Sequence, residues 1–145
     1  MYRKIDHIAI AVRSIESALK AYAGAMGFQG CHVEEIAEQK TRVALLPVGE
    51  SRIELLEATG EDSPVAGFIS KRGEGLHHVC FEVDDLGEEL RKLRNAGMRL
   101  IEPAPQAGAE GSLIAFVHPS GTCGVLVELC QPKSGRSHEF HESEA

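Results

Sequence analysis

The sequence lacks the features that mark several broad classes of protein. It has no apolar run near the roughly 18 residues that a helix needs to cross a bilayer. The net charge is −7, and Lys and Arg form no cluster of the kind that contacts the phosphates of nucleic acid. The first residues also lack the apolar stretch of a secretion signal. We therefore expect a cytoplasmic protein that binds neither a membrane nor nucleic acid.

The four cysteines also lack the spacing of a metal or redox motif. Cys31, Cys80, Cys123 and Cys130 form no C-x-x-C pair, which excludes a zinc knuckle or a thioredoxin-type site. Reduced thiols are typical of a cytosolic protein. Cys80 lies in an apolar segment, so we expect it to be a small buried side chain.

What the sequence does contain is an internal repeat. The 145 residues are 43% hydrophobic and 26% charged, which suits one compact domain. Two similar apolar segments occur, at residues 6–12 and 77–83, and each has a His at its first or second position. A helical pattern follows each segment, beginning at Ser14 in the first half and at Asp85 in the second. The same order of elements in both halves indicates a duplicated module.

Each half is predicted to be a βαβββ module, at about 4–58 and about 76–132. Two further strands are expected in each, at roughly 29–37 and 40–47, then at roughly 98–103 and 112–118. A connector, 59–75, has a short helical patch at 65–70, and 133–145 is a polar tail expected to be disordered. The fold class is therefore α+β, with residues 1–132 as a single domain. Its two tandem modules are expected to form a partly closed, metal-containing β-sheet cavity with the helices outside.

Two histidines and two glutamates occupy equivalent places in the halves. His7 and His78 begin the first strand of each module, and Glu54 and Glu128 lie on the last. Strand side chains alternate between faces, so each module presents one His and one Glu away from its helix. Two imidazoles and two carboxylates suit a divalent first-row metal with a position left open for substrate. We predict that His7, Glu54, His78 and Glu128 bind one divalent ion per chain. The choice among Co, Mn, Ni, Zn and Fe stays open.

The remaining histidines fit this pattern less well. His77 is out of step with His7 and is not expected to be a ligand, while His32, His138 and His141 have no counterpart in the other half. His118 lies before the last strand, where a loop either contacts substrate or is simply solvated.

These residues resemble the vicinal oxygen chelate (glyoxalase/bleomycin resistance) superfamily over residues 4–132. Four stretches are similar to the methylmalonyl-CoA epimerase family within it. They are 6–12, 62–66, 75–84 with its double His, and the run from His118-Pro119 through 124–129. The resemblance implies an acyl-CoA substrate and a homodimer.

The resemblance also implies a reaction. It is the interconversion of (R)- and (S)-methylmalonyl-CoA by proton transfer at C2 through a metal-stabilised enolate. His7, His78 and Glu128 match the family's metal ligands, and Glu54 stands where some members have Gln. Glu128 is also the candidate catalytic base. A second base is needed on the opposite face of C2, and Glu35 and Glu38 both remain open for it.

Three other functions remain open on this scaffold. Lactoylglutathione lyase has the same set of two His and two Glu, and only the surrounding motifs favour the epimerase. An extradiol dioxygenase uses two His, one carboxylate and Fe(II), and a fourth ligand at Glu54 weighs against it. A drug-sequestering protein of the same fold typically lacks the full ligand set.

Overall fold

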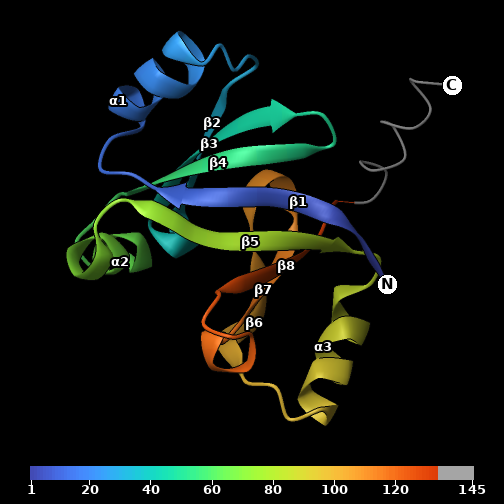
Figure 1. Cartoon of the computed structure of the whole chain (residues 1–145). Coiled ribbons are helices and arrows are strands. Elements are labelled where there is room, and N and C mark those ends of the chain that lie inside the picture. The colour runs from blue at the N-terminus through green and yellow to red at the C-terminus, as the bar shows by residue number, and fades with distance from the viewer. Residues whose placement is uncertain (134–145) are drawn as a thin grey trace, which may run out of the picture. The chain divides into compact units, whose positions relative to one another are not determined.

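Figure 1 shows the computed structural model of the chain, which describes residues 1–133. The helices are α1 (Ile15–Leu19), α2 (Pro64–Arg72) and α3 (Leu86–Asn95). The strands are β1 (Tyr2–Ala11), β2 (His32–Ile36), β3 (Thr41–Val48), β4 (Ser51–Ala58), β5 (Gly75–Val83), β6 (Leu100–Ala107), β7 (Leu113–Val117) and β8 (Val127–Gln131). The tail that was expected to be disordered, 133–145, lies outside the described residues, apart from residue 133. Within 1–133, no helix combines the length and apolar character needed to cross a membrane.

The chain divides into two compact units. The first unit is Ile5–Cys80, and the second is Met1–Lys4 together with the chain from Phe81 on. The boundaries between the units therefore fall within β1 and within β5, so each of these strands begins in one unit and ends in the other. Elements follow the order βαβββ twice, with α2 in the connector where the short helical patch was expected. The α+β class predicted from the sequence is confirmed.

In the first unit the strand order is β2-β3-β4-β1-β5. Strand β1 runs parallel to β4, with Ala9 opposite Glu54, and β4 runs antiparallel to β3, with Glu54 opposite Leu45. Paired residues project to the same face, so the register fixes which side chains share a face. One face carries the apolar core under α1, which includes Val12, Ile15, Ala44, Leu46 and Leu55. His7 and Glu54 project from the other face, as alternation along the strands predicts.

The first helix departs from its expected form after one turn. Ser14 is its N-cap and accepts a hydrogen bond from the backbone N–H of Ser17, as the sequence indicates. From Lys20 to Ala25 the helix widens into π geometry, and Met26 N–H donates to the carbonyl of Ala21. A π turn holds more residues than an α turn, so it shifts the stripe of core-facing residues. An unbroken α-helical period through Ile15, Ala18 and Tyr22 would put Met26 on that stripe, but Met26 is 61% exposed.

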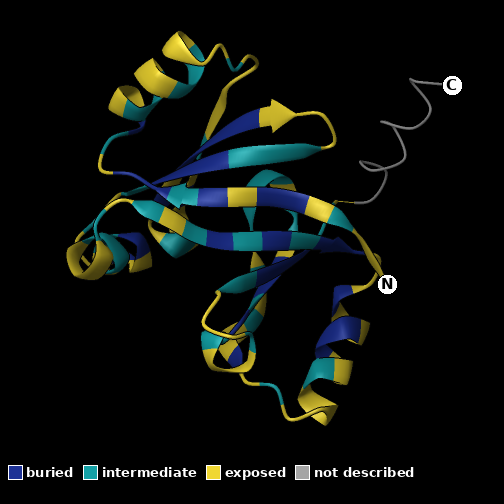
Figure 2. Ribbon diagram, in the orientation of Figure 1, coloured by how far each residue is buried: buried dark blue, intermediate teal, exposed yellow. Residues whose placement is uncertain are grey.

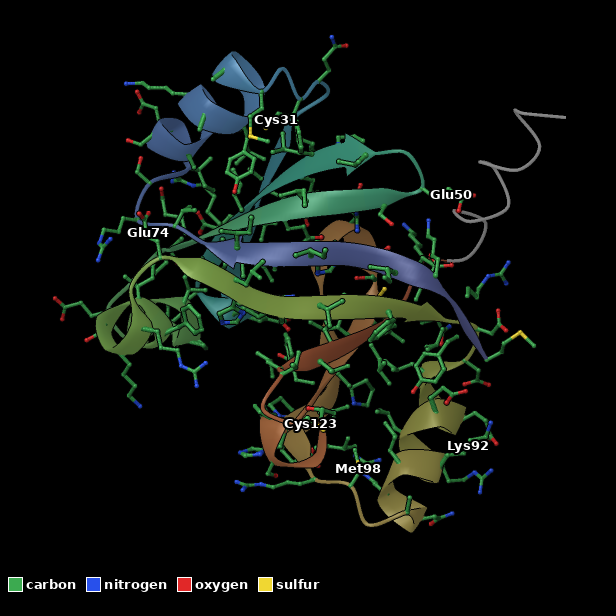
Figure 3. The ribbon with its side chains drawn as sticks, in the orientation of Figure 1. Cys31, Glu50, Glu74, Lys92, Met98 and Cys123 are labelled. Carbon is green, nitrogen blue, oxygen red and sulfur yellow. The ribbon has the colours of Figure 1, made fainter. Side chains whose placement is uncertain are left out.

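In the second unit the strand order is β5-β8-β7-β6. Its core lies between this sheet and α3, and Figure 2 shows buried positions along one side of that helix. Asp85 caps α3 by accepting the backbone N–H of Glu88, and Leu86 and Leu90 are fully buried. Each such Leu contributes about 1.5–3 kcal/mol of apolar burial. In Figure 3, Lys92 lies on the outer side of α3 and Met98 follows the helix, packed against the same core.

Strand β6 is longer than the sequence predicts. We expected a loop from Pro103 onward, but the strand continues to Ala107. Pro103 and Pro105 have no N–H to donate to the neighbouring strand. The pairing of β6 with β7 is irregular between Ile101 and Gln106, the stretch that contains both prolines. β6 is at the end of the strand order, and an edge strand tolerates this loss.

Candidate metal centre

Two buried histidines face each other in the first unit. His7 comes from β1 and His78 from β5, which are neighbouring strands. Their Nε2 atoms are 3.1 Å apart, and the rings are nearly perpendicular at 76°. Both residues are at most 8% exposed. A pair of basic ring nitrogens held this close, away from bulk water, needs a positive charge or a shared proton between them.

The spacing of these two nitrogens fits a shared metal ion. A divalent ion such as Zn²⁺ binds imidazole nitrogen at about 2.0–2.1 Å, so two ligands at 90–110° are separated by about 2.9–3.4 Å. The distance between the Nε2 atoms lies inside that range. Imidazole is a good ligand for several first-row divalent ions. The donor pair therefore fits the ion that the sequence predicts.

A carboxylate and a guanidinium lie behind His7. The Nδ1 atom of His7 is 2.6 Å from Oδ2 of Asp6, and Arg52 donates to the same oxygen at 2.8 Å. Burial by itself would raise the pKa of Asp6. The hydrogen bond with His7 and the charge of Arg52 outweigh burial and lower that pKa to about 2. Asp6 is thus an ionised acceptor at neutral pH, and it aims Nε2 of His7 towards His78.

Glu54 also contacts the ring of His7. Its Oε2 is 3.0 Å from Nδ1 of His7 and 3.5 Å from a guanidinium nitrogen of Arg52. The carboxylate is buried, and the register of β4 against β1 places it on the face of His7. The structure therefore places the Glu54 carboxylate beside the imidazole ring of His7.

A second histidine lies behind His78. Nδ1 of His77 is 2.8 Å from Nδ1 of His78, so one of these nitrogens donates and the other accepts. The ring of His77 packs edge-on against Phe68 of α2, with centroids 4.8 Å apart. His77 was not expected to bind a metal, and its place behind His78 fits a supporting residue.

Glu128 is in the second unit. It lies on β8 opposite Phe116 of β7, and it is 5% exposed. Its neighbours Val127 and Leu129 project into the core under α3. Glu128 therefore projects from the face away from the helix, as strand alternation predicts.

The two candidates for a second base differ in position. Glu35 lies opposite Arg42, next along β2 from Glu34, which lies opposite Val43. Because Arg42 and Val43 are adjacent on β3, they project to opposite faces, and Val43 shares the face of Glu54. Glu35 thus projects away from the face of His7. Glu38 is in the short 3-10 segment Ala37–Gln39, outside the strand, so strand alternation does not determine its direction.

His118, in the second unit, forms hydrogen bonds within its own turn. Its Nδ1 accepts the backbone N–H of Ser120 at 3.0 Å and lies 2.8 Å from the hydroxyl of the same residue. This turn explains part of the His-Pro motif structurally. Contact between His118 and a substrate stays a prediction.

From the sequence alone, no supporting role was predicted for three residues that contact the candidate ligands. Asp6 and His77 each precede a predicted ligand, and Arg52 is two residues before Glu54, so alternation puts both on one face. That spacing was a usable signal for Arg52. The roles of Asp6 and His77 depend on side-chain rotation, which strand periodicity does not encode.

The chain is similar over most of its length to known epimerases. Residues 6–116 match the sequence model of the Glyoxalase/Bleomycin resistance protein/Dioxygenase superfamily. The mitochondrial methylmalonyl-CoA epimerase of Bos taurus is 36% identical over 129 residues, which cover 88% of this chain and 74% of the relative. The ethylmalonyl-CoA/methylmalonyl-CoA epimerase of Cereibacter sphaeroides is 35% identical over 133 residues, which cover 90% and 99%.

A solved structure agrees with these relatives. A variant of Streptomyces coelicolor methylmalonyl-CoA epimerase, in complex with 2-nitronate-propionyl-CoA, superimposes with a TM-score of 0.88 at 36% identity. The match covers 92% of this chain and 97% of that chain. By sequence and by fold, the chain belongs to the methylmalonyl-CoA epimerase family, a family of isomerases within the Glyoxalase/Bleomycin resistance protein/Dioxygenase superfamily.

Proposed function

We propose that this protein interconverts the (R) and (S) epimers of methylmalonyl-CoA by moving the proton on C2. The observation that carries the proposal is the buried pair of Nε2 atoms of His7 and His78, 3.1 Å apart, in a chain of this family. Relatives that act on malonyl-type CoA esters align with nearly the whole chain. No equally specific observation favours another substrate class.

We propose His7, His78, Glu54 and Glu128 as the residues that hold one divalent ion. When bound, the ion would supply a Lewis acid that stabilises negative charge developing on the substrate oxygens. The two histidines have the donor spacing for it. Glu54 and Glu128 are proposed because they are buried carboxylates at equivalent places in the repeat, with Glu54 projecting away from α1 and Glu128 away from α3. Two carboxylates would balance the charge of the ion.

Glu128 is also proposed to exchange a proton with C2. That carbon lies between a thioester and a carboxylate, so its proton is weakly acidic and a positioned carboxylate can remove it. Inversion requires that the proton leave from one face and a proton return on the other. One carboxylate therefore does not suffice, and a second acid must lie across the substrate.

Glu38 is the better candidate for that second acid. Strand alternation turns Glu35 to the α1 side of the sheet, away from the face that carries His7. Glu38 lies in the turn after β2, so strand alternation does not direct it to the α1 side. The two residues lie on the same short stretch, so they make a matched pair for substitution.

The experiment compares substrates and metals on one preparation. Protein treated with a chelator should lose epimerisation of (S)-methylmalonyl-CoA, and about one equivalent of Co²⁺, Mn²⁺, Ni²⁺ or Zn²⁺ should restore it. Ethylmalonyl-CoA and the methylglyoxal–glutathione hemithioacetal are the comparison substrates. Turnover of the hemithioacetal without turnover of either CoA ester would replace the proposal with lactoylglutathione lyase activity. Full activity after complete metal removal would remove the ion from the proposal.

A further inference from the structure

The His7–His78 pair can bind a cation only if each ring carries its proton on the far nitrogen. A neutral imidazole has one N–H and one lone pair. For both Nε2 atoms to offer lone pairs to the same ion, the proton of each ring must sit on Nδ1. An isolated imidazole populates both tautomers, so a partner at each Nδ1 must select one of them.

At His7 that partner is Asp6. An ionised carboxylate only accepts hydrogen bonds, so the contact of 2.6 Å between Oδ2 and Nδ1 requires the proton on Nδ1 of His7. Arg52 donates to the same carboxylate at 2.8 Å and keeps it from turning away. The group that contacts Nδ1 of His7 is therefore a carboxylate, and Arg52 holds that carboxylate in place.

At His78 the partner is His77. Their Nδ1 atoms, 2.8 Å apart, share one proton. If His78 keeps that proton, His77 accepts with a lone pair on Nδ1 and carries its own proton on Nε2. Phe68 holds the His77 ring edge-on, and the guanidinium of Arg72 lies 5.6 Å from the centroid of the Phe68 ring. The support behind His78 is therefore a neutral ring held by packing.

We propose that Asp6 and His77 are positioning residues that fix the Nδ1–H tautomers of His7 and His78, and so point both Nε2 lone pairs at one ion. The inference rests on the proposed metal site and adds to it the residues that prepare the ligands. The two supports differ in chemistry, with a carboxylate behind one ligand and an imidazole behind the other. Partners of this kind behind metal ligands typically change metal affinity by about 10–100-fold when they are lost.

The direct test is the protonation state of three rings in protein loaded with Zn²⁺. Long-range ¹H–¹⁵N correlation spectra distinguish the two tautomers of each histidine. We expect the proton on Nδ1 in His7 and His78, and on Nε2 in His77. A proton on Nδ1 of His77 would overturn the inference, because His78 would then be an acceptor at Nδ1 and not a donor.

A second test measures affinity for Zn²⁺ by calorimetry in four variants and one control. His77→Phe keeps a ring against Phe68 but removes the acceptor, and Asp6→Leu removes the carboxylate; both should bind about 10–100-fold more weakly. His77→Gln and Asp6→Asn keep an oxygen that accepts from Nδ1–H, so they should retain more of the affinity. If Asp6→Leu fails to fold, His77→Phe still decides the question. His32→Asn changes an exposed histidine on β2 and should leave affinity unchanged.

The outcomes separate this inference from the proposed function. Wild-type affinity in His77→Phe and in folded Asp6→Leu, with the wild-type protein loading normally, would overturn the positioning roles and leave the metal site intact. Failure of the wild-type protein to take up Zn²⁺ or any other divalent ion would overturn both.

Discussion

Replacing Asp6 with Asn should destabilise the metal-free protein at neutral pH. Folding lowers the pKa of Asp6 from 3.8 to about 2, because the hydrogen bond with His7 and the charge of Arg52 outweigh the effect of burial. At 1.36 kcal/mol for each tenfold change in proton affinity, that lowering corresponds to about 2.5 kcal/mol of stability. The carboxylate is largely buried, so solvent does not screen these partners strongly. Asn keeps the shape of the side chain but not its charge.

The pH dependence of this loss has a defined sign. A carboxyl group with a lowered folded-state pKa stabilises the protein above its unfolded pKa, near 3.8, and that stability is lost as the pH falls towards 2. Urea denaturation of both proteins in chelator should therefore give a difference of about 2.5 kcal/mol at pH 7 and about half of it at pH 3.

The control is Asp84→Asn, which breaks a more exposed contact of 2.6 Å with Arg3 and should cost clearly less stability, because solvent screens an exposed ion pair. Equal effects of the two substitutions at pH 7, or a difference for Asp6→Asn that does not change with pH, would refute the reasoning.

Five further substitutions probe the catalytic acids and the packing of α3. Glu128→Gln should bind metal when the ion is in excess and yet turn over about 10²–10⁴-fold more slowly, because an amide cannot take the C2 proton; full activity at saturating metal would leave Glu128 a ligand only. Glu38→Gln should abolish inversion while Glu35→Gln stays close to wild type in the same epimerisation assay, and the reverse order would exchange their roles. Leu90→Ala removes a fully buried side chain of α3 and should lower the free energy of unfolding by about 2–5 kcal/mol, whereas Arg91→Ala on the exposed side should leave it close to the wild-type value.

Strand alternation made much of the site predictable from the sequence. The repeat of a His strand and a Glu strand placed His7 and Glu54 on one face, and the register of β1 against β4 confirms that placement. The same rule put Glu128 on the face away from α3. These predictions succeeded because a strand has a period of two, and one buried face fixes the phase of the whole strand.

Two parts of the fold were not predictable from pattern alone. The helix changes to π geometry after Leu19, where Tyr22 and Phe28 pack against the core under α1, and an α-helical periodicity assigns Met26 to the wrong side. Strand β6 passes through Pro103 and Pro105, which local rules assign to a loop. In both cases tertiary contacts outweigh the preference of the local sequence.

The supporting side chains were the least predictable part of the site. A sequence gives the face from which His77 or Asp6 projects, but not the rotation that brings an Nδ1 atom or a carboxylate oxygen within hydrogen-bond distance of a neighbouring ring. Choosing between Glu35 and Glu38 likewise required the register of β2 against β3, which fixes the face of Glu35.

The most direct test of the central proposal is proton exchange at C2. Metal-loaded protein is incubated with (S)-methylmalonyl-CoA in D₂O, and the product is analysed by NMR and by chromatography that separates the epimers. We expect deuterium to enter C2 and the (R) epimer to accumulate to equilibrium, with neither change when the double variant His7→Ala, His78→Ala is used. A metal-loaded wild-type protein that leaves the C2 proton in place and forms no (R) epimer would contradict the account.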